Sequence, residues 1–321
     1  MRILIWHVHG SWLTAFTQGG HEYLIPVTPD RGADGRGRAR TWTWPANARE
    51  LTPGQLADAE VDVVVLQRPH EEQLAASWLR RGLGGRIPIV YVEHNTPRGD
   101  APTTRHPMAD RPDVRLVHVT HFNDLMWDAG KTPTSVIEHG VVDPGCRYTG
   151  ELPRIGVAIN EPIRRNRVTG TDLLPRFADL APLDVFGMQV DGLADALSVA
   201  RDRLRAIDDP PQHALHTELP RRRVYLHPMR WTSLGLSLIE AMMLGMPVVA
   251  MASTAAPDAV PASGGLVSAD IEKLRAAARE FLHEPEHARI AGTAGRRSAL
   301  ARFGVDRFVA DWDRLLNEVT T

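Results

Sequence analysis

Residues 221–266 read RRRVYLHPMRWTSLGLSLIEAMMLGMPVVAMASTAAPDAVPASGGL, and this stretch decides the fold. Val224–Leu226 is a short apolar segment that predicts a strand. A helix is expected after it, because apolar residues from Leu236 to Met243 form too broad a face for a surface helix. Gly245 ends that helix, and the apolar run Met246–Met251 is typical of a parallel strand that is covered on both faces. Strand, helix and strand within about thirty residues predict a βαβ unit.

A single acid, Glu240, lies on this otherwise apolar helix. Burying a carboxylate without a partner is costly, so Glu240 requires either a structural partner or a ligand. The expected helix start, Ser233–Leu236, leaves backbone N–H groups free, and such groups bind anions. The unit therefore offers an anion cradle at the start of the helix and a hydrogen-bond acceptor further along it.

The segment H-P-x-x-W-T-S-L-G-L-S-L-I-E-A-M-x-x-G-x-P-V-V-A, residues 227–250, resembles the donor-site signature of the retaining glycosyltransferases of family 4, which have the GT-B fold. The matching positions are Gly235, Glu240, Ala241, Gly245, Pro247 and Val248. The resemblance implies that Glu240 accepts both hydroxyls of a nucleotide ribose. It also implies that the N–H groups of Ser233, Leu234 and Gly235 stabilise the diphosphate of the donor.

This chain departs from the signature at Thr232, where the family usually has a first glutamate beside the donor sugar. Threonine forms hydrogen bonds but carries no charge. Either the donor sugar does not require a carboxylate there, or the protein binds a nucleotide sugar without transferring it efficiently. The resemblance implies a front-face mechanism in which the leaving diphosphate takes the acceptor proton, so Thr232 is expected to position the sugar.

A second basic segment, Asn160–Leu174, carries Arg164, Arg165 and Arg167 between a strand and a helix. Clustered arginines bind phosphate well. The family pattern is an arginine, four residues, a lysine and a glycine. Arg164 matches the arginine, Gly170 matches the glycine, and Thr169 replaces the lysine, so we expect Arg165 or Arg167 to supply the missing charge; a solvated basic turn is the alternative. By the same resemblance, the base lies near Gly187 and Thr217.

Polar residues follow the strands of the first half of the chain, where ligands of parallel sheets bind. The candidates for binding an acceptor at these strand ends are His7, His9, Trp12, Arg68, Asn95 and His121. The resemblance places His94 opposite the reacting sugar, although a histidine is also a common structural residue at a strand end. It places Gly10 near the donor diphosphate. Trp12 either stacks on a sugar ring or packs in the core.

Repeated alternation of strand and helix predicts an α/β fold. We expect the GT-B form, with two Rossmann-like parallel-sheet domains facing a central cleft. Residues 1–148 are the expected acceptor domain and residues 149–304 the expected donor domain, and a last helix at about 305–321 packs back on the first. One further helix is expected over Asp191–Arg205. The Gly- and Arg-rich segment Arg31–Arg40 predicts a flexible surface loop. The alternative is a loop that binds an anion or the acceptor.

The composition limits the function. The 321 residues carry a net charge of −2, so no global basic surface indicates a nucleic-acid partner. The one cysteine, Cys146, allows no disulfide within the chain, and we expect a cytoplasmic protein. The first residues read as a strand and not as a signal peptide, and no apolar run is long enough for an integral membrane segment. The histidines form no short metal-binding motif, so no metal is expected.

The expected function is therefore a metal-independent, retaining glycosyltransferase. Its donor is a nucleoside-diphosphate sugar acting as co-substrate, its acceptor is a small soluble molecule, and it needs no cofactor. Two alternatives stay open: a noncatalytic nucleotide-sugar-binding homologue or partner subunit, and a nucleotide-sugar epimerase of the GT-B type. The sequence leaves the sugar, the base, the acceptor and the oligomeric state open.

Overall fold

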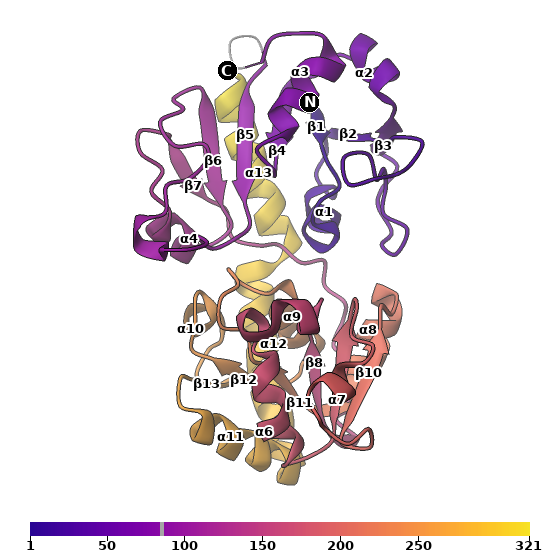
Figure 1. Ribbon diagram of the computed structural model, residues 1–321, viewed down its shortest axis with the longest axis vertical. Coiled ribbons are helices and arrows are strands. Elements are labelled where there is room, and N and C mark those ends of the chain that lie inside the picture. The colour runs from indigo at the N-terminus through magenta and orange to yellow at the C-terminus, as the bar shows by residue number, and fades with distance from the viewer. Residues whose placement is uncertain (84–86) are drawn as a thin grey trace. The chain divides into compact units, whose positions relative to one another are not determined.

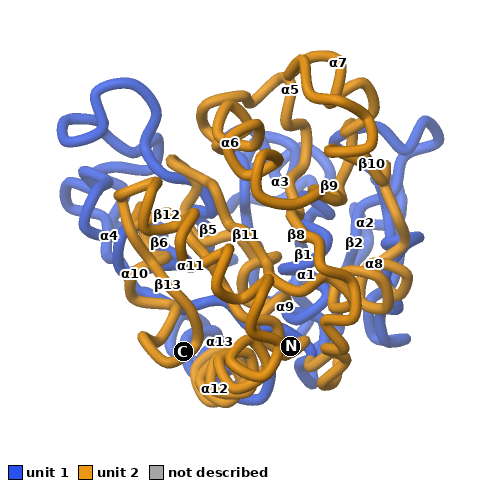
Figure 2. The backbone as a smooth tube through the Cα atoms, turned by 90° about the horizontal axis from the view of Figure 1, so that it is seen from below, with its two compact units in different colours: residues 1–142, 305–321 blue, residues 143–304 orange. Residues whose placement is uncertain are grey.

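Each half of the chain forms its own parallel β-sheet with flanking helices (Figure 1). The computed structural model describes residues 1–83 and 87–321. It divides into unit 1, residues 1–142 and 305–321, and unit 2, residues 143–304 (Figure 2). The boundary after Val142 lies six residues before the division predicted after residue 148.

Unit 1 contains a seven-stranded sheet among the described residues, in the order β3-β2-β1-β4-β5-β6-β7. Its strands are β1 (Arg2–Ile5), β2 (Glu22–Pro26), β3 (Ala48–Leu51), β4 (Val63–Leu66), β5 (Ile89–Glu93), β6 (Val114–His118) and β7 (Thr134–Val136). Its helices are α1 (Gly10–Phe16), α2 (Pro53–Asp58), α3 (Glu71–Leu79), α4 (His121–Met126) and α13 (Val305–Thr320), with a 3-10 turn at Ala101–Thr103. The central strand β4 is apolar and fully buried, as expected for a parallel strand covered on both faces.

Unit 2 contains a six-stranded sheet in the order β10-β9-β8-β11-β12-β13. Its strands are β8 (Leu152–Ala158), β9 (Leu183–Gly187), β10 (Leu204–Asp208), β11 (Arg222–His227), β12 (Val248–Met251) and β13 (Gly265–Ser268). Its helices are α5 (Pro162–Arg165), α6 (Leu174–Ala178), α7 (Leu193–Ala196), α8 (Gln212–Glu218), α9 (Leu236–Leu244), α10 (Ala256–Ala259), α11 (Ile271–His283) and α12 (Pro285–Phe303). Three 3-10 turns lie at Asn166–Thr169, Thr171–Leu173 and Leu219–Arg221.

The βαβ unit predicted from residues 221–266 is confirmed as β11, α9 and β12. Strands β11 and β12 are parallel neighbours, and every residue of α9 from Leu238 to Leu244 is buried. Gly245 ends the helix with a φ of 90°, a left-handed conformation that glycine adopts without cost. The helix begins at Leu236, so the preceding turn from His227 to Gly235 is irregular and lies at the carboxyl end of β11.

The helix predicted over Asp191–Arg205 is wrong. Only Leu193–Ala196 is α-helical, and Ser198 has a left-handed φ of 53°, which breaks the helix. Leu204–Asp208 is instead β10, an edge strand that pairs only with β9. A short edge strand keeps polar residues such as Arg205 exposed, so it lacks the continuous apolar run that marks a buried strand.

The last helix, α13, presents Phe308, Trp312, Leu315 and Leu316 to the core of unit 1. It packs on α1, where the rings of Trp12 and Trp312 meet edge to face with centroids 5.7 Å apart. In the described part of the chain, no helix combines the length and the apolar character that crossing a bilayer requires.

Candidate functional site

Glu240, on α9, faces helix α8 of the same unit. Its residue is 7% exposed, so the carboxylate is largely removed from water. Gln212 Nε2 donates to Glu240 Oε1 at 3.4 Å, and His216 Nε2 lies 3.9 Å from Glu240 Oε2. Both contacts are long, and a carboxylate can accept about four hydrogen bonds in all. Sequence reasoning missed Gln212 and His216, because a helix separate from the signature supplies them.

The turn between β11 and α9 is tightly packed around His227. A Cβ atom added at Gly235 would lie 2.7 Å from His227 Cε1, so only glycine fits against this ring. Burial lowers the pKa of His227 to about 4, which keeps the imidazole neutral at pH 7. Ser253 Oγ donates to the carbonyl oxygen of Met229 at 2.7 Å and fixes the turn from the next strand end.

The residues of this turn that were predicted to bind the nucleotide-sugar donor are mostly buried. Ser233 and Leu234 are 5% and 7% exposed, so both residues are almost fully covered. Thr232 Oγ1 donates to Met229 Sδ at 3.4 Å, a weak interaction that a better acceptor would replace. Helix α9 follows directly, and the first turn of a helix presents backbone N–H groups that can bind an anion.

The basic segment after β8 has a strained backbone. Glu161 and Asn166 have φ values of 54° and 37°, which non-glycine residues adopt at a cost and which often occur at functional sites. Gly170 also has a left-handed φ, and a Cβ there would lie 1.9 Å from the carbonyl oxygen of Pro228. Arg230 N donates to the carbonyl oxygen of Val168 at 3.0 Å. These contacts join the segment to the β11–α9 turn, so the two predicted donor segments lie side by side.

Two of the three predicted phosphate-binding arginines pair with neighbouring acids. Arg164 forms an ion pair with Glu161, which holds the pKa of that carboxyl below its usual value. Arg167 contacts Asp172 at 3.0 Å, and Asp172 also binds Arg230. The side chains of Arg164 and Arg167 are 68% and 73% exposed, so these ion pairs are weak and a phosphate can compete for the arginines.

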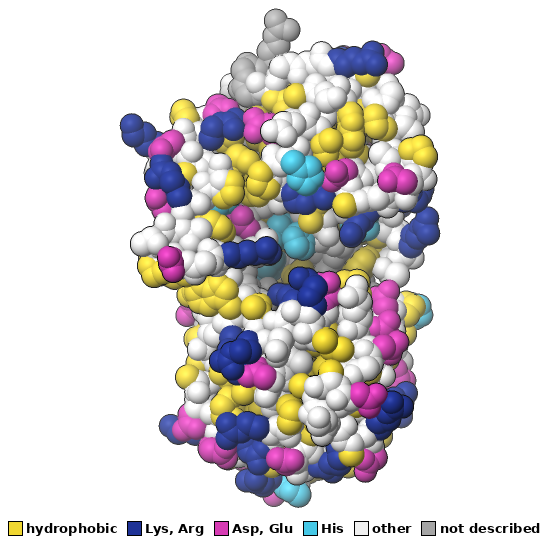
Figure 3. Space-filling model, in the orientation of Figure 1, with side chains coloured by type: hydrophobic (Ala, Val, Ile, Leu, Met, Phe, Trp, Pro, Cys, Tyr) yellow, Lys and Arg dark blue, Asp and Glu magenta, His cyan; other side chains and the backbone are white. Residues whose placement is uncertain are grey.

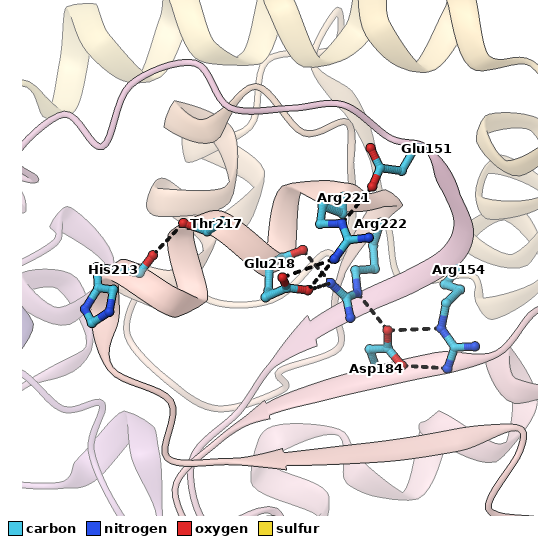
Figure 4. Close-up of polar contacts among 8 residues, drawn as sticks. All are labelled: Glu151, Arg154, Asp184, His213, Thr217, Glu218, Arg221 and Arg222. Atoms are coloured by element: carbon cyan, nitrogen blue, oxygen red, sulfur yellow. Dashed lines mark hydrogen bonds and ion pairs between the residues drawn. The ribbon is translucent and has the colours of Figure 1, made fainter.

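Gly187 and Thr217, predicted near the base, have different surroundings. Gly187 has a φ of 147°, and a Cβ would lie 1.9 Å from the carbonyl oxygen of Ile159, so β9 ends in close contact with the end of β8. Thr217 Oγ1 donates to the carbonyl oxygen of His213 at 2.9 Å within α8 (Figure 4). Its neighbour Glu218 binds Arg221 and Arg222, and thus belongs to an ion-pair network (Figure 4).

In unit 1, His9 and His94 lie together at the carboxyl ends of β1 and β5. Their ring centroids are 4.1 Å apart. Burial lowers the pKa of His9 to about 4, and it lowers the pKa of His94 well below its ordinary value, with His9 and His139 adding to the effect. Both rings are therefore neutral at pH 7. Within the residues that the structure describes, His94 Nε2 is buried without a hydrogen-bond partner, so it can receive a ligand group.

Trp12 packs in the core, which is one of its two predicted roles. It has no exposed surface, stacks on Phe16 at a centroid distance of 4.8 Å and meets His94 edge to face at 5.1 Å. Its ring therefore packs against the ring of His94. Gly10 is covered as well, since a Cβ there would lie 2.5 Å from the ring of Trp42. Sequence reasoning missed Trp42 because it lies far along the loop after β2.

Asn95 is held by the buried carboxylate of Glu93. Glu93 Oε1 accepts from Asn95 N at 2.6 Å and from Asn95 Nδ2 at 3.2 Å, while Glu93 Oε2 contacts His106 Nε2 at 3.1 Å. His106 Nδ1 accepts from Met108 N at 3.0 Å, so Nε2 carries the proton and donates to Glu93. This Glu93–His106 pair fixes the strand end that carries His94. His106 is a further residue that sequence reasoning missed.

The remaining candidates of unit 1 lie at strand ends of the same sheet. His7 Nδ1 donates to the carbonyl oxygen of Gly37 at 2.9 Å. Arg68 contacts Glu71 at 2.7 Å and Asp34 at 3.0 Å, so its guanidinium is held by two acids. His121 is exposed at the first position of α4. Across residues 1–83 and 87–321, no group of three or more His, Cys, Asp and Glu side chains is arranged to hold a metal ion.

Comparison with known proteins shows the fold. Over its full length the chain is similar to sucrose-phosphate synthase from Thermosynechococcus elongatus, with 15% identity, a TM-score of 0.73 and coverage of 99% of this chain and 98% of the other. It is also similar to HepE from Anabaena in complex with UDP and glucose, with 13% identity, a TM-score of 0.69 and coverage of 99% and 100%. The predicted GT-B fold is thereby confirmed.

A third solved structure, a glycosyltransferase from Rickettsia africae, matches with 13% identity and a TM-score of 0.66, covering 99% of this chain and 97% of the other. No curated protein matches the sequence significantly. Residues 198–298 match the family described as glycosyl transferases group 1, and this segment contains the whole β11–α9–β12 unit with Glu240. The segment match and the GT-B fold together support a GT-B glycosyltransferase.

Proposed function

We propose that the protein is a retaining glycosyltransferase of the family 4 type. It moves a sugar from a nucleoside-diphosphate sugar to a hydroxyl of a small soluble acceptor, with no metal and no cofactor. The observation that carries the proposal is Glu240, a largely buried carboxylate inside the segment that matches glycosyl transferases group 1. We propose UDP as the first nucleotide to test, because HepE, which has the same fold, binds UDP and glucose.

Unit 2 binds the donor in this proposal. Glu240 accepts the two ribose hydroxyls of the nucleotide. The diphosphate is bound by the N–H groups at the start of α9 and by the exposed arginines Arg164 and Arg167. These groups stabilise the negative charge that develops on the diphosphate as the sugar leaves. Glu161 and Asp172 release these arginines when phosphate competes for them. Thr232 offers a hydroxyl to the sugar where a carboxylate is usual.

The transfer step keeps the configuration of the anomeric carbon. The bond from that carbon to the diphosphate oxygen breaks, and a bond to the acceptor oxygen forms on the same face of the sugar. The acceptor proton passes to the leaving diphosphate oxygen, so no protein nucleophile is needed. His94 is neutral at pH 7 and has an unpartnered Nε2 among the described atoms, and it holds a hydroxyl of the reacting sugar or the acceptor.

The test is a ligand panel followed by an assay. The melting temperature of the protein is measured with UDP, GDP, ADP, TDP and CMP at about 100 times the expected dissociation constant, where one bound ligand adds about 2.7 kcal/mol of stability. Sugars of the best nucleotide are then incubated with candidate acceptors, and the anomeric configuration of the product is read by NMR. A product with inverted configuration, or the absence of any nucleotide binding, would overturn the proposal.

One observation favours a second function. Thr232 replaces a charged residue and has only a weak sulfur contact, which fits a noncatalytic protein that binds a nucleotide sugar. Nucleotide binding without transfer to any acceptor would support that function. Conversion of the nucleotide sugar itself, with no acceptor present, would identify an epimerase instead.

A further inference from the structure

Unit 1 contains a basic pocket outside the residues assigned above to the donor. The cavity has a volume of about 540 Å³ and is lined by His7, Pro29, Asp30, Arg31, Arg36, Arg38 and Arg40. It lies at the carboxyl ends of the neighbouring strands β1 and β2, where ligands of parallel sheets bind. On the visible face of unit 1, Lys or Arg and His side chains lie among acidic and apolar ones (Figure 3). Its size suits a monosaccharide or another small molecule.

Two of the four arginines build the pocket. Arg31 Nη1 and Nη2 each donate to a separate oxygen of Glu50 at 2.9 Å, so this guanidinium is fully engaged by β3. Arg38 donates from its guanidinium to the carbonyl oxygens of Trp44 at 2.6 Å and Pro45 at 3.2 Å. These contacts tie the loop after β2 to the chain that follows it, so the loop is held in place.

The backbone of the loop is held as firmly as its side chains. Arg38 N donates to Glu50 Oε1 at 2.7 Å, and Gly37 N donates to the carbonyl oxygen of Pro26 at 3.0 Å. Gly37 has a φ of 69°, and a Cβ there would lie 2.3 Å from Glu50 Oε1. A pocket that is built before the ligand arrives loses less entropy when it binds.

The other two arginines are available to a ligand. Arg36 and Arg40 are exposed, and the structure, over the residues it describes, gives neither guanidinium an ion pair or a hydrogen bond. Arg36 also lies near enough to His7 and His9 to help lower the pKa of both rings. Asp30 and Glu50 offset two of the four arginine charges, so the pocket keeps a surplus of positive charge that matches a dianion.

His7 adds a neutral polar group to the wall of the pocket. Its Nδ1 donates to the carbonyl oxygen of Gly37, which leaves Nε2 as a hydrogen-bond acceptor. Burial lowers the pKa of His7, so the ring stays neutral at pH 7. Trp44 meets the ring edge to face at 4.8 Å and fixes its orientation. The pocket therefore combines two free guanidiniums for an anion with one acceptor for a hydroxyl.

We propose that this pocket binds the phosphate group of a small phosphorylated acceptor, such as a sugar phosphate or a polyol phosphate. Two unpaired guanidiniums suit a phosphate dianion, which takes bidentate hydrogen bonds from more than one arginine, better than a carboxylate with its single charge. The role as acceptor rests on the proposed glycosyl transfer. The binding of phosphate does not, because all the residues that carry it belong to unit 1.

The test measures binding by isothermal titration calorimetry to the full chain, with and without UDP. The probes are glucose 6-phosphate, glucose, glucuronate and inorganic phosphate. We expect glucose 6-phosphate to bind at least tenfold more tightly than glucose or glucuronate. Arg36→Gln and Arg40→Gln each remove one charged donor and are expected to weaken that binding about tenfold or more. Arg49→Gln is the matched control, since it removes an arginine of the same unit that pairs with Glu22 outside the pocket.

Equal affinities for glucose and glucose 6-phosphate, equal affinities for glucuronate and glucose 6-phosphate, or unchanged affinity in both pocket variants would overturn the inference. UDP binding separates the two proposals. If the sugar phosphate binds through Arg36 and Arg40 while no nucleotide binds, the phosphate pocket is supported and the proposed glycosyl transfer is contradicted. If nucleotides bind and sugar is transferred to neutral acceptors, while a phosphate group on the acceptor does not increase its affinity, the transferase is supported and the phosphate pocket is contradicted.

Discussion

The ring of His227 fills the space where a side chain of Gly235 would lie, so that a Cβ at Gly235 would come within 2.7 Å of His227 Cε1. This contact joins the last residue of β11 to the residue that precedes α9. The contact therefore lies directly before the N–H groups that we propose bind the diphosphate. The proposed diphosphate site thus depends on a packing contact between two residues that need not touch the ligand.

Gly235→Ala is expected to destabilise the protein by about 1–3 kcal/mol, the usual cost of overpacking a filled core. The backbone itself tolerates alanine, because Gly235 has a φ of −67°, so the cost comes from the His227 ring alone. Urea unfolding measures the change. The control is Gly295→Ala in α12, where the added Cβ meets only ordinary contacts at 3.6 Å and alanine favours the helix. A Gly235→Ala variant as stable as the control would contradict the role of this contact.

Glu240→Gln is expected to weaken nucleotide binding by about 1–3 kcal/mol, because a charged hydrogen-bond acceptor is replaced by a neutral amide. Isothermal titration calorimetry with the nucleotide chosen by the ligand panel measures the loss. Glu286→Gln is the matched control in the same unit, since Glu286 pairs with Arg289 at the surface and is 68% exposed. Unchanged nucleotide affinity in folded Glu240→Gln would remove this residue from the donor site.

Glu93→Gln is expected to destabilise unit 1 by about 1–3 kcal/mol. Both carboxylate oxygens accept hydrogen bonds, from Asn95 on one side and His106 on the other. Glutamine has a single acceptor oxygen, so one buried donor would be left unpaired. Urea unfolding reports the stability, and faster hydrogen exchange at the Asn95 amide reports the loosened strand end.

The surface pair of Glu60 and Arg2 provides the control for this prediction. The side chain of Glu60 is 72% exposed, so Glu60→Gln is expected to change the stability by less than about 0.5 kcal/mol. If Glu93→Gln were as stable as Glu60→Gln, the Glu93–His106 pair would not be what holds the end of β5.

Sequence patterns predicted those segments whose secondary structure follows from their own residues. The β11–α9–β12 unit is continuous, its strands are apolar, and α9 is buried all round, so the hydrophobic pattern alone was sufficient. The edge strands β3 and β10 were not predicted, because a strand with one neighbour needs no continuous apolar run. In both sheets the pattern therefore revealed the centre and missed one edge.

The partners of the site residues depend on contacts between distant segments. Glu240 was visible in the sequence, but Gln212 and His216 reach it only because α8 packs beside α9. The acids that pair with Arg164 and Arg167 are three and five residues away, yet that proximity alone does not determine the pairing. The backbone of this segment also contains left-handed conformations at Glu161 and Asn166, which the sequence pattern did not predict.

The buried network around Asp184 gives a prediction for stability away from the site. Asp184 is 1% exposed and accepts hydrogen bonds from Arg154 at 2.6 Å and from Arg222 at 2.7 Å (Figure 4). Asp184→Asn removes the negative charge and leaves the buried Arg222 without its closest anion. We expect a loss of about 3–5 kcal/mol in urea unfolding, the range for breaking a buried ion pair. Asp195→Asn, at a surface pair with Arg201, is the control and should cost less than about 1 kcal/mol.

The buried His227 makes stability depend on pH in a defined window. Its pKa falls from 6.5 to about 4 on folding, because burial disfavours the charged ring. Below pH 6.5 the unfolded chain therefore binds a proton that the folded protein does not, so stability decreases as the pH falls and this contribution levels off below about pH 4. Between pH 6.5 and 5 the loss is on the order of 2 kcal/mol, since one pKa unit corresponds to about 1.4 kcal/mol.

His227→Gln removes this titration, so its unfolding free energy is expected to fall less than that of the wild type between pH 7 and pH 5. All other titratable residues are the same in both proteins, so the difference between the two curves isolates His227. His287→Gln, at a half-exposed surface pair with Glu280 in the same unit, is the control for replacing a histidine that is not buried. Parallel curves for the wild type and His227→Gln would mean that the ring is already solvated in the folded protein, and that the turn before α9 is more open than its contacts with Gly235 indicate.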